Sequence, residues 1–240
     1  PTMTITAAEG TDGFTSNDST LSLTFTSSEA AVGFTAGDIY TAGTGAISNF
    51  ATTSSTVYTA TFTPATAGAC TIDVSAGKFQ DGAGNSNTAA TQFNWTYDNS
   101  SPTMTITAAE GTSPLSSNDA TLSLTFTSNE VMTGFEESDV TGLSGGLLTL
   151  WSGSGTTYTA TFTPDEDETY TITVAAGTFT DAAGNVNTQG TFTWTHDATA
   201  PTAGTVNDGS SAPDVEFQLS TSVIDANWDG FSDGSGSGIA

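Results

Sequence analysis

Carboxylates are the residues of this sequence with the clearest potential for chemistry. Its 240 residues include 26 Asp and Glu but a single Lys or Arg, so the formal net charge is −25. Carboxylates and Asn carbonyls that converge at one end of a protein offer the hard oxygen ligands that Ca²⁺ prefers. Six acidic positions recur about a hundred residues apart, as the pairs Glu9/Glu110, Asp18/Asp119, Glu29/Glu130, Asp38/Asp139, Asp81/Asp181 and Asp98/Asp197.

A calcium site built from these repeated acids is one hypothesis. The candidate ligands are strand-end acids, turn acids and linker acids with two Asn residues: Glu29, Asp38, Asp81, Asn85, Asp98, Glu130, Asp139, Asp181, Asn185 and Asp197. The alternative is that Asp and Asn shape turns and add solubilising charge without any metal. The spacing does not form an EF-hand loop, so both interpretations stay open. The acidic run 165–168, which has no counterpart in the first half of the chain, is interpreted as a solvated turn.

Few residues could catalyse a reaction. The chain has a single His, His196, and a single Cys, Cys70. A Ser-His-Asp triad in each repeat is excluded because the first repeat has no His, and zinc sites need spaced Cys and His pairs. Carboxylate pairs alone would permit a glycosidase, but acids in the turns of a small repeated unit are a poor scaffold for one. We therefore expect a non-catalytic protein with a mechanical role.

Three Asn-x-Ser/Thr sequons are candidate glycosylation sites, at Asn17, Asn94 and Asn99. Asn94 lies between two apolar residues of an expected strand, so its side chain should face solvent. The second repeat lacks all three sequons, so chance occurrence is the alternative.

The elements that must position these residues are themselves repeated. Residues 1–10 return as residues 102–111, and residues 58–64 return as residues 158–164. We expect one domain over residues 1–101 and a second over residues 102–200. Residues 201–240 begin with another Pro-Thr pair but then diverge, which suggests an incomplete third module.

Inside each repeat the apolar residues alternate with polar ones. Leu21, Leu23 and Phe25 alternate with Ser and Thr, and Phe93 alternates with Trp95 in the same way. This period of two is typical of half-buried strands, and Gly-rich and Asp-rich turns separate the runs. The pattern predicts an all-β chain of tandem immunoglobulin-like antiparallel β-sandwiches. They are expected to lack disulfides, because Cys70 is alone and in step with core positions.

Composition also excludes several partners. The near absence of Lys and Arg argues against nucleic-acid binding, since phosphate contacts need cations. No apolar run is long enough for a membrane span. The apolar fraction of 35% with 10% aromatics argues for a packed core rather than disorder.

The motifs Leu-Ser-Leu-Thr-Phe-Thr-Ser-x-Glu, Tyr-Thr-Ala-Thr-Phe-Thr-Pro and Phe-x-Asp-x-Ala-Gly-Asn, found within residues 1–200, resemble the tandem bacterial Ig-like repeats. Such repeats occur in giant cell-surface proteins and adhesins, and similar arrays occur in large proteins of unicellular algae. The resemblance implies an extracellular, cell-surface location. It also implies neighbouring copies of the repeat or of the chain as partners, and calcium at domain junctions as a stiffening device. Residues 203–240 resemble the start of a fibronectin type III-like module, in which residues 215–219 and 224–228 would be strands.

These observations favour a structural repeat of a surface protein, an adhesin stalk or filament that acts as a rigid spacer. Two alternatives remain open. One is a module that binds carbohydrate or another cell-surface ligand, for which Trp151 is the residue to watch, since an exposed ring could stack on a sugar. The other is an accessory region of a larger secreted protein. The two strands expected within residues 203–240 could belong to a truncated domain or pair with a neighbouring molecule.

Overall fold

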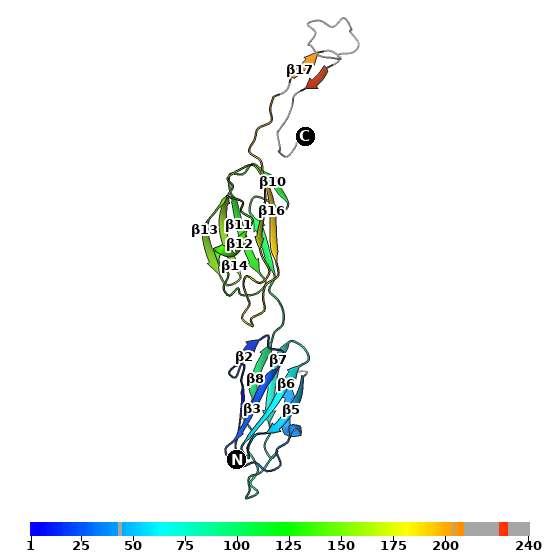
Figure 1. Ribbon diagram of the computed structural model, residues 1–240, viewed down its shortest axis with the longest axis vertical. Helices are drawn as coiled ribbons and strands as arrows, with labels where there is room; N and C mark the ends of the chain where they lie inside the picture. Colours follow the sequence, from blue (N-terminus) through cyan, green and yellow to red (C-terminus); the bar gives the residue numbers. More distant parts are fainter. Residues whose placement is uncertain (43–44, 204, 209–225, 230–240) are drawn as a thin grey trace. The chain divides into compact units, whose positions relative to one another are not determined.

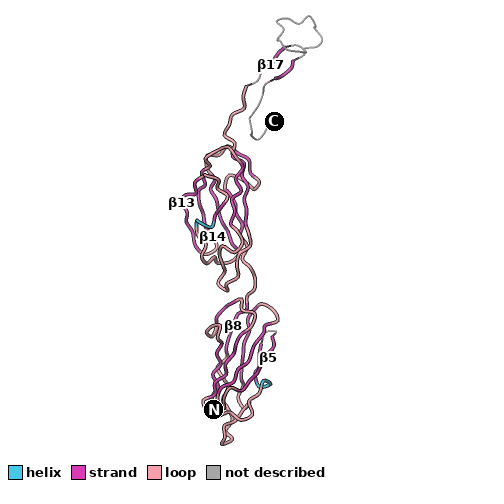
Figure 2. The backbone as a smooth tube through the Cα atoms, in the orientation of Figure 1, coloured by secondary structure: helices cyan, strands magenta, loops and turns pink. Residues whose placement is uncertain are grey.

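The chain forms two compact units built almost entirely of strands and loops (Figure 1, Figure 2). The computed structural model describes residues 1–42, 45–203, 205–208 and 226–229. Unit 1 comprises Pro1–Pro102, Val131–Gly134 and Phe179–Asn187, and unit 2 comprises Thr103–Glu130, Phe135–Thr178 and Thr188–Ala240. No described helix is long and apolar enough to cross a membrane.

The strands of unit 1 form a sandwich of two four-stranded sheets, here called the first sandwich. One sheet has the order β1 (Met3–Ala7), β3 (Leu21–Ser27), β6 (Val57–Pro64), β5 (Gly45–Thr52). The other has the order β2 (Phe14–Ser16), β8 (Phe93–Tyr97), β7 (Gly68–Val74), β4 (Ile39–Ala42). A short 3-10 helix, η1 (Ala36–Asp38), precedes β4. All neighbouring strands are antiparallel except β2 and β8, which are parallel.

The predicted core of the first sandwich is confirmed. Strand β3 buries Leu21, Leu23 and Phe25, because period-two alternation directs these side chains to one face of the sheet. The apolar residues that alternate along β3, β6, β7 and β8 are all at most 4% exposed: Leu21, Leu23, Phe25, Tyr58, Phe62, Ile72, Val74, Phe93 and Trp95. Cys70 is also buried, at 2% exposure, and burial raises the pKa of its thiol. It is therefore a core residue, as expected.

The second sandwich repeats this plan within unit 2. Its strands are β9 (Met104–Ala108), β10 (Leu115–Ser117), β11 (Leu122–Ser128), β12 (Val140–Thr141), β13 (Leu147–Ser154), β14 (Thr157–Thr163), β15 (Thr169–Val174) and β16 (Gly190–His196). The 3-10 helix η2 (Glu137–Asp139) corresponds to η1. The sheets have the orders β13-β14-β11-β9 and β10-β16-β15-β12, with β10 and β16 parallel. The immunoglobulin-like fold is confirmed, with one parallel pair in each sandwich that the sequence pattern did not indicate.

A bulge distorts one edge strand of each sandwich. The register of β5 against β6 shifts between Ser48 and Ala51, and that of β13 against β14 shifts between Thr149 and Ser152. The bulge places Asn49 and Leu150 in the left-handed region, with φ angles of 51° and 55°. Because the two bulges have the same register, Leu150 of one sandwich corresponds to Asn49 of the other, and Leu147 corresponds to Ala46.

Past the second sandwich, β17 (Thr205–Asp208) pairs with β18 (Ala226–Asp229) in antiparallel fashion. The predicted strand at residues 215–219 lies outside the described residues. So does most of the suggested fibronectin type III-like module.

Candidate metal centre

The Asp-x-x-Gly-Asn loop of the first sandwich is a closed turn. Asp81 Oδ1 accepts hydrogen bonds from the backbone N–H groups of Ala83 and Asn85, both at 2.9 Å, and Asp81 Oδ2 accepts one from Asn85 Nδ2 at 2.8 Å. These bonds, led by those from Asn85, hold the pKa of the Asp81 carboxyl below its ordinary value. Asp81 is thus an ionised turn former, which is the metal-free role considered for it.

The equivalent loop, 181–185, shares the bonds between its Asn and Asp residues but has different surroundings. Asn185 donates to both carboxylate oxygens of Asp181 at 2.9 Å, from its backbone N–H and from Nδ2. Asn185 Nδ2 also donates to the backbone oxygen of Asp98 at 2.9 Å, and Asn17 N–H donates to Ala183 O at 3.0 Å. All these residues belong to unit 1.

Asp98 and Asp181 are the carboxylates that this packing brings together. Each offers an oxygen within 4.8 Å of the other, and Asp181 is only 4% exposed. The chain's single Lys or Arg is Lys78, in the loop that also holds Asp81. Two like charges at this distance repel each other, and a divalent cation would relieve that repulsion. A donor set of carboxylate oxygens fits a hard cation such as Ca²⁺ and does not fit a zinc site built from thiolates and imidazoles.

The expected grouping of Asp81 with Asp98 needs correction. Strand β7 runs antiparallel to β8 with Gly68 opposite Tyr97, so Asp98 lies at the end of the sheet where β7 begins. Asp81 follows the other end of β7, beyond Val74. The two acids of the first sandwich are therefore at opposite ends of it, and the loop that meets Asp98 is 181–185.

The remaining candidate ligands are engaged locally. Asp38 Oδ2 accepts from Thr35 N–H at 2.9 Å, and Asp139 Oδ2 accepts from Glu136 N–H at 2.8 Å, so both cap a 3-10 helix. Asp197 Oδ1 accepts from Thr199 N–H at 3.1 Å. Glu29 and Glu130 each donate a backbone N–H to a Ser hydroxyl two residues earlier. Among the described residues, the carboxylates of Glu29, Asp38 and Asp81 do not lie close enough together to form a group of three that could hold a metal ion.

The three sequons occupy different environments. Asn17 and Asn99 are exposed. Asn94 is half-buried, and its Nδ2 donates to Asp12 Oδ1 at 3.0 Å and to Gln92 O at 3.4 Å. A glycan on Asn94 would have to displace these bonds, so Asn17 and Asn99 are the more accessible candidates.

Sequence reasoning missed Asn87, which organises the loop between β7 and β8. It is 3% exposed, and its Oδ1 accepts from the N–H groups of Lys78 and Phe79 while Nδ2 donates to Ser75 O and Thr88 O. Asn187 is equally buried and its Oδ1 accepts from Phe179 N–H. The recurrence of Asn-x-Asn at 85–87 and 185–187 was the available signal.

The acidic run 165–168 is more ordered than a solvated turn. The Tyr170 hydroxyl accepts from the N–H groups of Asp165 and Glu166 and donates to Asp165 Oδ1 at 2.9 Å. Asp167 accepts from Ala198 N–H and from the Thr199 hydroxyl, and its Oδ1 lies 3.1 Å from His196 Nδ1. His196 is therefore part of a structural contact that holds residues 197–199 near this loop.

Trp151 belongs to an aromatic cluster. Its ring is half-buried, with centroids 5.5 Å from Phe126, 5.3 Å from Phe135 and 5.5 Å from Tyr158. A ring held on several sides is positioned mainly by core packing.

The fold and the repeated loops define the class of protein to which the chain belongs. It consists of tandem immunoglobulin-like sandwiches, and the described residues form no disulfide. The chain belongs to the bacterial Ig-like domain family, whose model matches residues 1–97 and again residues 98–199. No protein with a curated description matches it.

Several solved structures are similar to the chain at low identity. InvD of Yersinia pseudotuberculosis is 17% identical, with 98% of this chain and 71% of that chain covered and a TM-score of 0.40. The D00-D0 domain of intimin is 13% identical, with 80% and 98% covered and a TM-score of 0.37. The adhesin InvE of Yersinia pseudotuberculosis is 15% identical, with 81% and 58% covered and a TM-score of 0.29.

Proposed function

We propose that the chain is a non-catalytic spacer of an extracellular surface protein, a stalk or filament segment that carries tension. The family, the tandem repetition and the acidic composition support this role. The observation that carries it is the parallel pair that joins the second and the last strand of each sandwich, β2 with β8 and β10 with β16.

Parallel pairing determines how such a sandwich responds to tension. Force enters β2 from its N-terminal side and leaves β8 from its C-terminal side, and in a parallel pair these two ends lie at opposite ends of the ladder. The strands are therefore pulled lengthwise against each other, and the bonds between them are loaded together rather than one by one. Trp95 reinforces the pair, because its Nε1–H donates to Ser16 Oγ at 3.1 Å and its ring stacks on Phe14.

Single-molecule stretching of the whole chain tests this proposal. We expect two rupture events, each releasing about 300 Å of chain, because residues 3–97 and 104–196 would extend by about 3.3 Å per residue. Ser16→Ala should lower the rupture force of the first sandwich, and Ser117→Ala, which removes the bond from Trp194 Nε1, should lower that of the second. Ser22→Ala, on the exposed face of β3, is the control. Unfolding at forces near zero, unaffected by these variants, would rule out a load-bearing role.

Calcium binding is the second part of the proposal. We propose Asp98 and Asp181 as ligands, with Asn185 holding the loop that carries Asp181. A cation there would tie the linker acid to the 181–185 loop and so stiffen the chain.

Thermal unfolding in millimolar Ca²⁺ and in chelator tests the calcium site. Free calcium at a hundred times its Kd would add about 2.7 kcal/mol to the unfolding free energy, so chelation should lower the Tm. Asp181→Asn should abolish the calcium-dependent shift. Asp81→Asn is the matched control, because Asp81 accepts the same two bonds from the Asn of its loop but lies at the far end of the first sandwich from Asp98. Identical melting curves of the wild type in calcium and chelator would refute this part and leave the mechanical proposal standing.

A further inference from the structure

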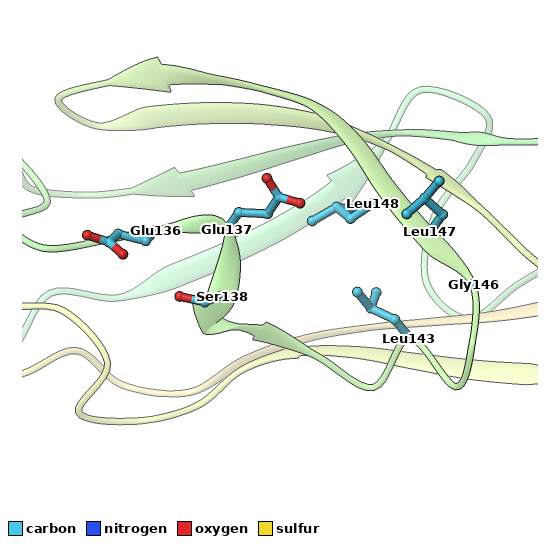
Figure 3. A pocket seen from close by; sticks show the side chains of 7 residues that line it. All are labelled: Glu136, Glu137, Ser138, Leu143, Gly146, Leu147 and Leu148. Atoms are coloured by element: carbon cyan, nitrogen blue, oxygen red, sulfur yellow. The ribbon is translucent and has the colours of Figure 1, made fainter.

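The second sandwich has a hollow whose lining combines apolar and acidic side chains. It lies between η2 and β13, has a volume of about 530 Å³ and is lined by Glu137, Ser138, Leu143, Leu147 and Leu148, with Glu136 at its rim. Figure 3 shows Leu143 and Leu148 directed into the space, with the side chain of Glu137 beside Leu148. All of these residues belong to unit 2.

Internal duplication provides a comparison for this surface. Glu136 and Glu137, at the start of η2, correspond to Thr35 and Ala36 at the start of η1. On the bulged strands Leu147 corresponds to Ala46, and four residues earlier Leu143 corresponds to Ala42. The aligned segments thus share their backbone plan but differ at the surface. The second sandwich alone combines large apolar side chains with two carboxylates.

The stability of the fold does not explain why a leucine occupies position 150. It is 78% exposed, and its φ of 55° lies in the left-handed region, which Asn tolerates better than Leu. The first sandwich has Asn49 there, whose Nδ2 donates to Thr61 Oγ1. Leu147, on the same strand, is also largely exposed, at 62%. Exposed apolar side chains on a strained edge are typical of binding surfaces.

The strand that carries these leucines is free to accept another strand. Within the part of the chain that the structure describes, β13 is an edge strand that pairs with β14 alone. An edge strand presents unpaired backbone donors and acceptors, which an extended peptide can use.

We propose that this surface, the β13 groove, binds an extended segment of a different protein that carries apolar side chains next to Lys or Arg. The segment adds a strand to β13, places its apolar side chains against Leu143, Leu147 and Leu150, and directs its cation to Glu137. A second copy of this chain does not meet the requirement, because 26 acids face a single Lys or Arg in each copy.

A displayed library of random dodecapeptides, selected on the full chain at low salt, tests the proposal. The decisive variant gives the groove the residues of the first sandwich: E136T, E137A, L143A, L147A and L150N. We expect enriched peptides that alternate apolar residues with Lys or Arg and that bind this variant at least tenfold more weakly. The opposite graft, T35E, A36E, A42L, A46L and N49L, should raise the stoichiometry from one peptide per chain to two. Circular dichroism and the Tm establish that both variants are folded.

Three results would overturn the proposal. One is a selection that yields only peptides bound equally well by the wild type and the E136T/E137A/L143A/L147A/L150N variant. Another is enrichment of peptides without basic residues, which would remove the role of Glu137. A third is wild-type self-association that this variant abolishes, seen by sedimentation, which would make the occupant a second copy.

Discussion

At the scale of single residues, buried polar side chains determine the shape of the long loops. The loop between β7 and β8 depends on Asn87, whose amide oxygen and nitrogen each make two hydrogen bonds to backbone groups. Each backbone group left without a partner in a buried position costs free energy.

We therefore expect Asn87→Ala to reduce the unfolding free energy of the first sandwich by about 2–4 kcal/mol, as for other disrupted buried networks. Asn85→Ala is the matched control, because Asn85 is exposed and bonds mainly to Asp81. Its effect should be clearly smaller. Urea titration of both variants measures the difference, and equal losses would contradict the role assigned to Asn87.

At the scale of elements, the Asp167 carboxylate anchors the segment that follows β16. Hydrogen bonds from the Thr199 hydroxyl and then from Ala198 N–H lower the pKa of this carboxyl from its ordinary value of 3.8. A lowered pKa means that the contact is favourable above pH 3.8 and is lost as the pH falls through the lowered value.

Backbone order parameters of Ala198 and Thr199 should therefore be high at pH 7 and should fall once an acid titration passes below 3.8 and through the lowered pKa of Asp167. Asp167→Ala should produce the low values already at pH 7, whereas Asp73→Asn, in the first sandwich, should leave them unchanged. Order that persists in Asp167→Ala at pH 7 would show that the anchor is elsewhere.

At the scale of the whole molecule, each sandwich has its own hydrophobic core. The buried residues of the first sandwich form one cluster within strands β1 to β8 and their loops. Phe25 and its counterpart Phe126 are each fully buried.

Phe25→Ala should cost the first sandwich about 3–5 kcal/mol and leave the second sandwich's transition in place, so calorimetry should show two separated transitions. Phe126→Ala should reverse which sandwich melts first. A single transition that shifts equally in both variants would mean that the two sandwiches unfold as one cooperative unit.

The sequence by itself determined the strands, the core and the duplication. Alternation in a run such as Leu21-Ser-Leu-Thr-Phe25 specifies a strand and its buried face locally, because the side-chain period of a strand is two. The internal repeat then predicted the same sandwich twice, and Cys70 was correctly placed in the core.

Only the tertiary structure decided which distant residues meet. The pairing of β2 with β8 joins Phe14 to Trp95, and Asp98 lies near Asp181 rather than Asp81. The burial of Asn87 and the exposure of Leu150 likewise follow from how loops and edge strands pack. Such contacts depend on which ends of the strands come together in space, and a local pattern of apolar and polar residues carries no information about that.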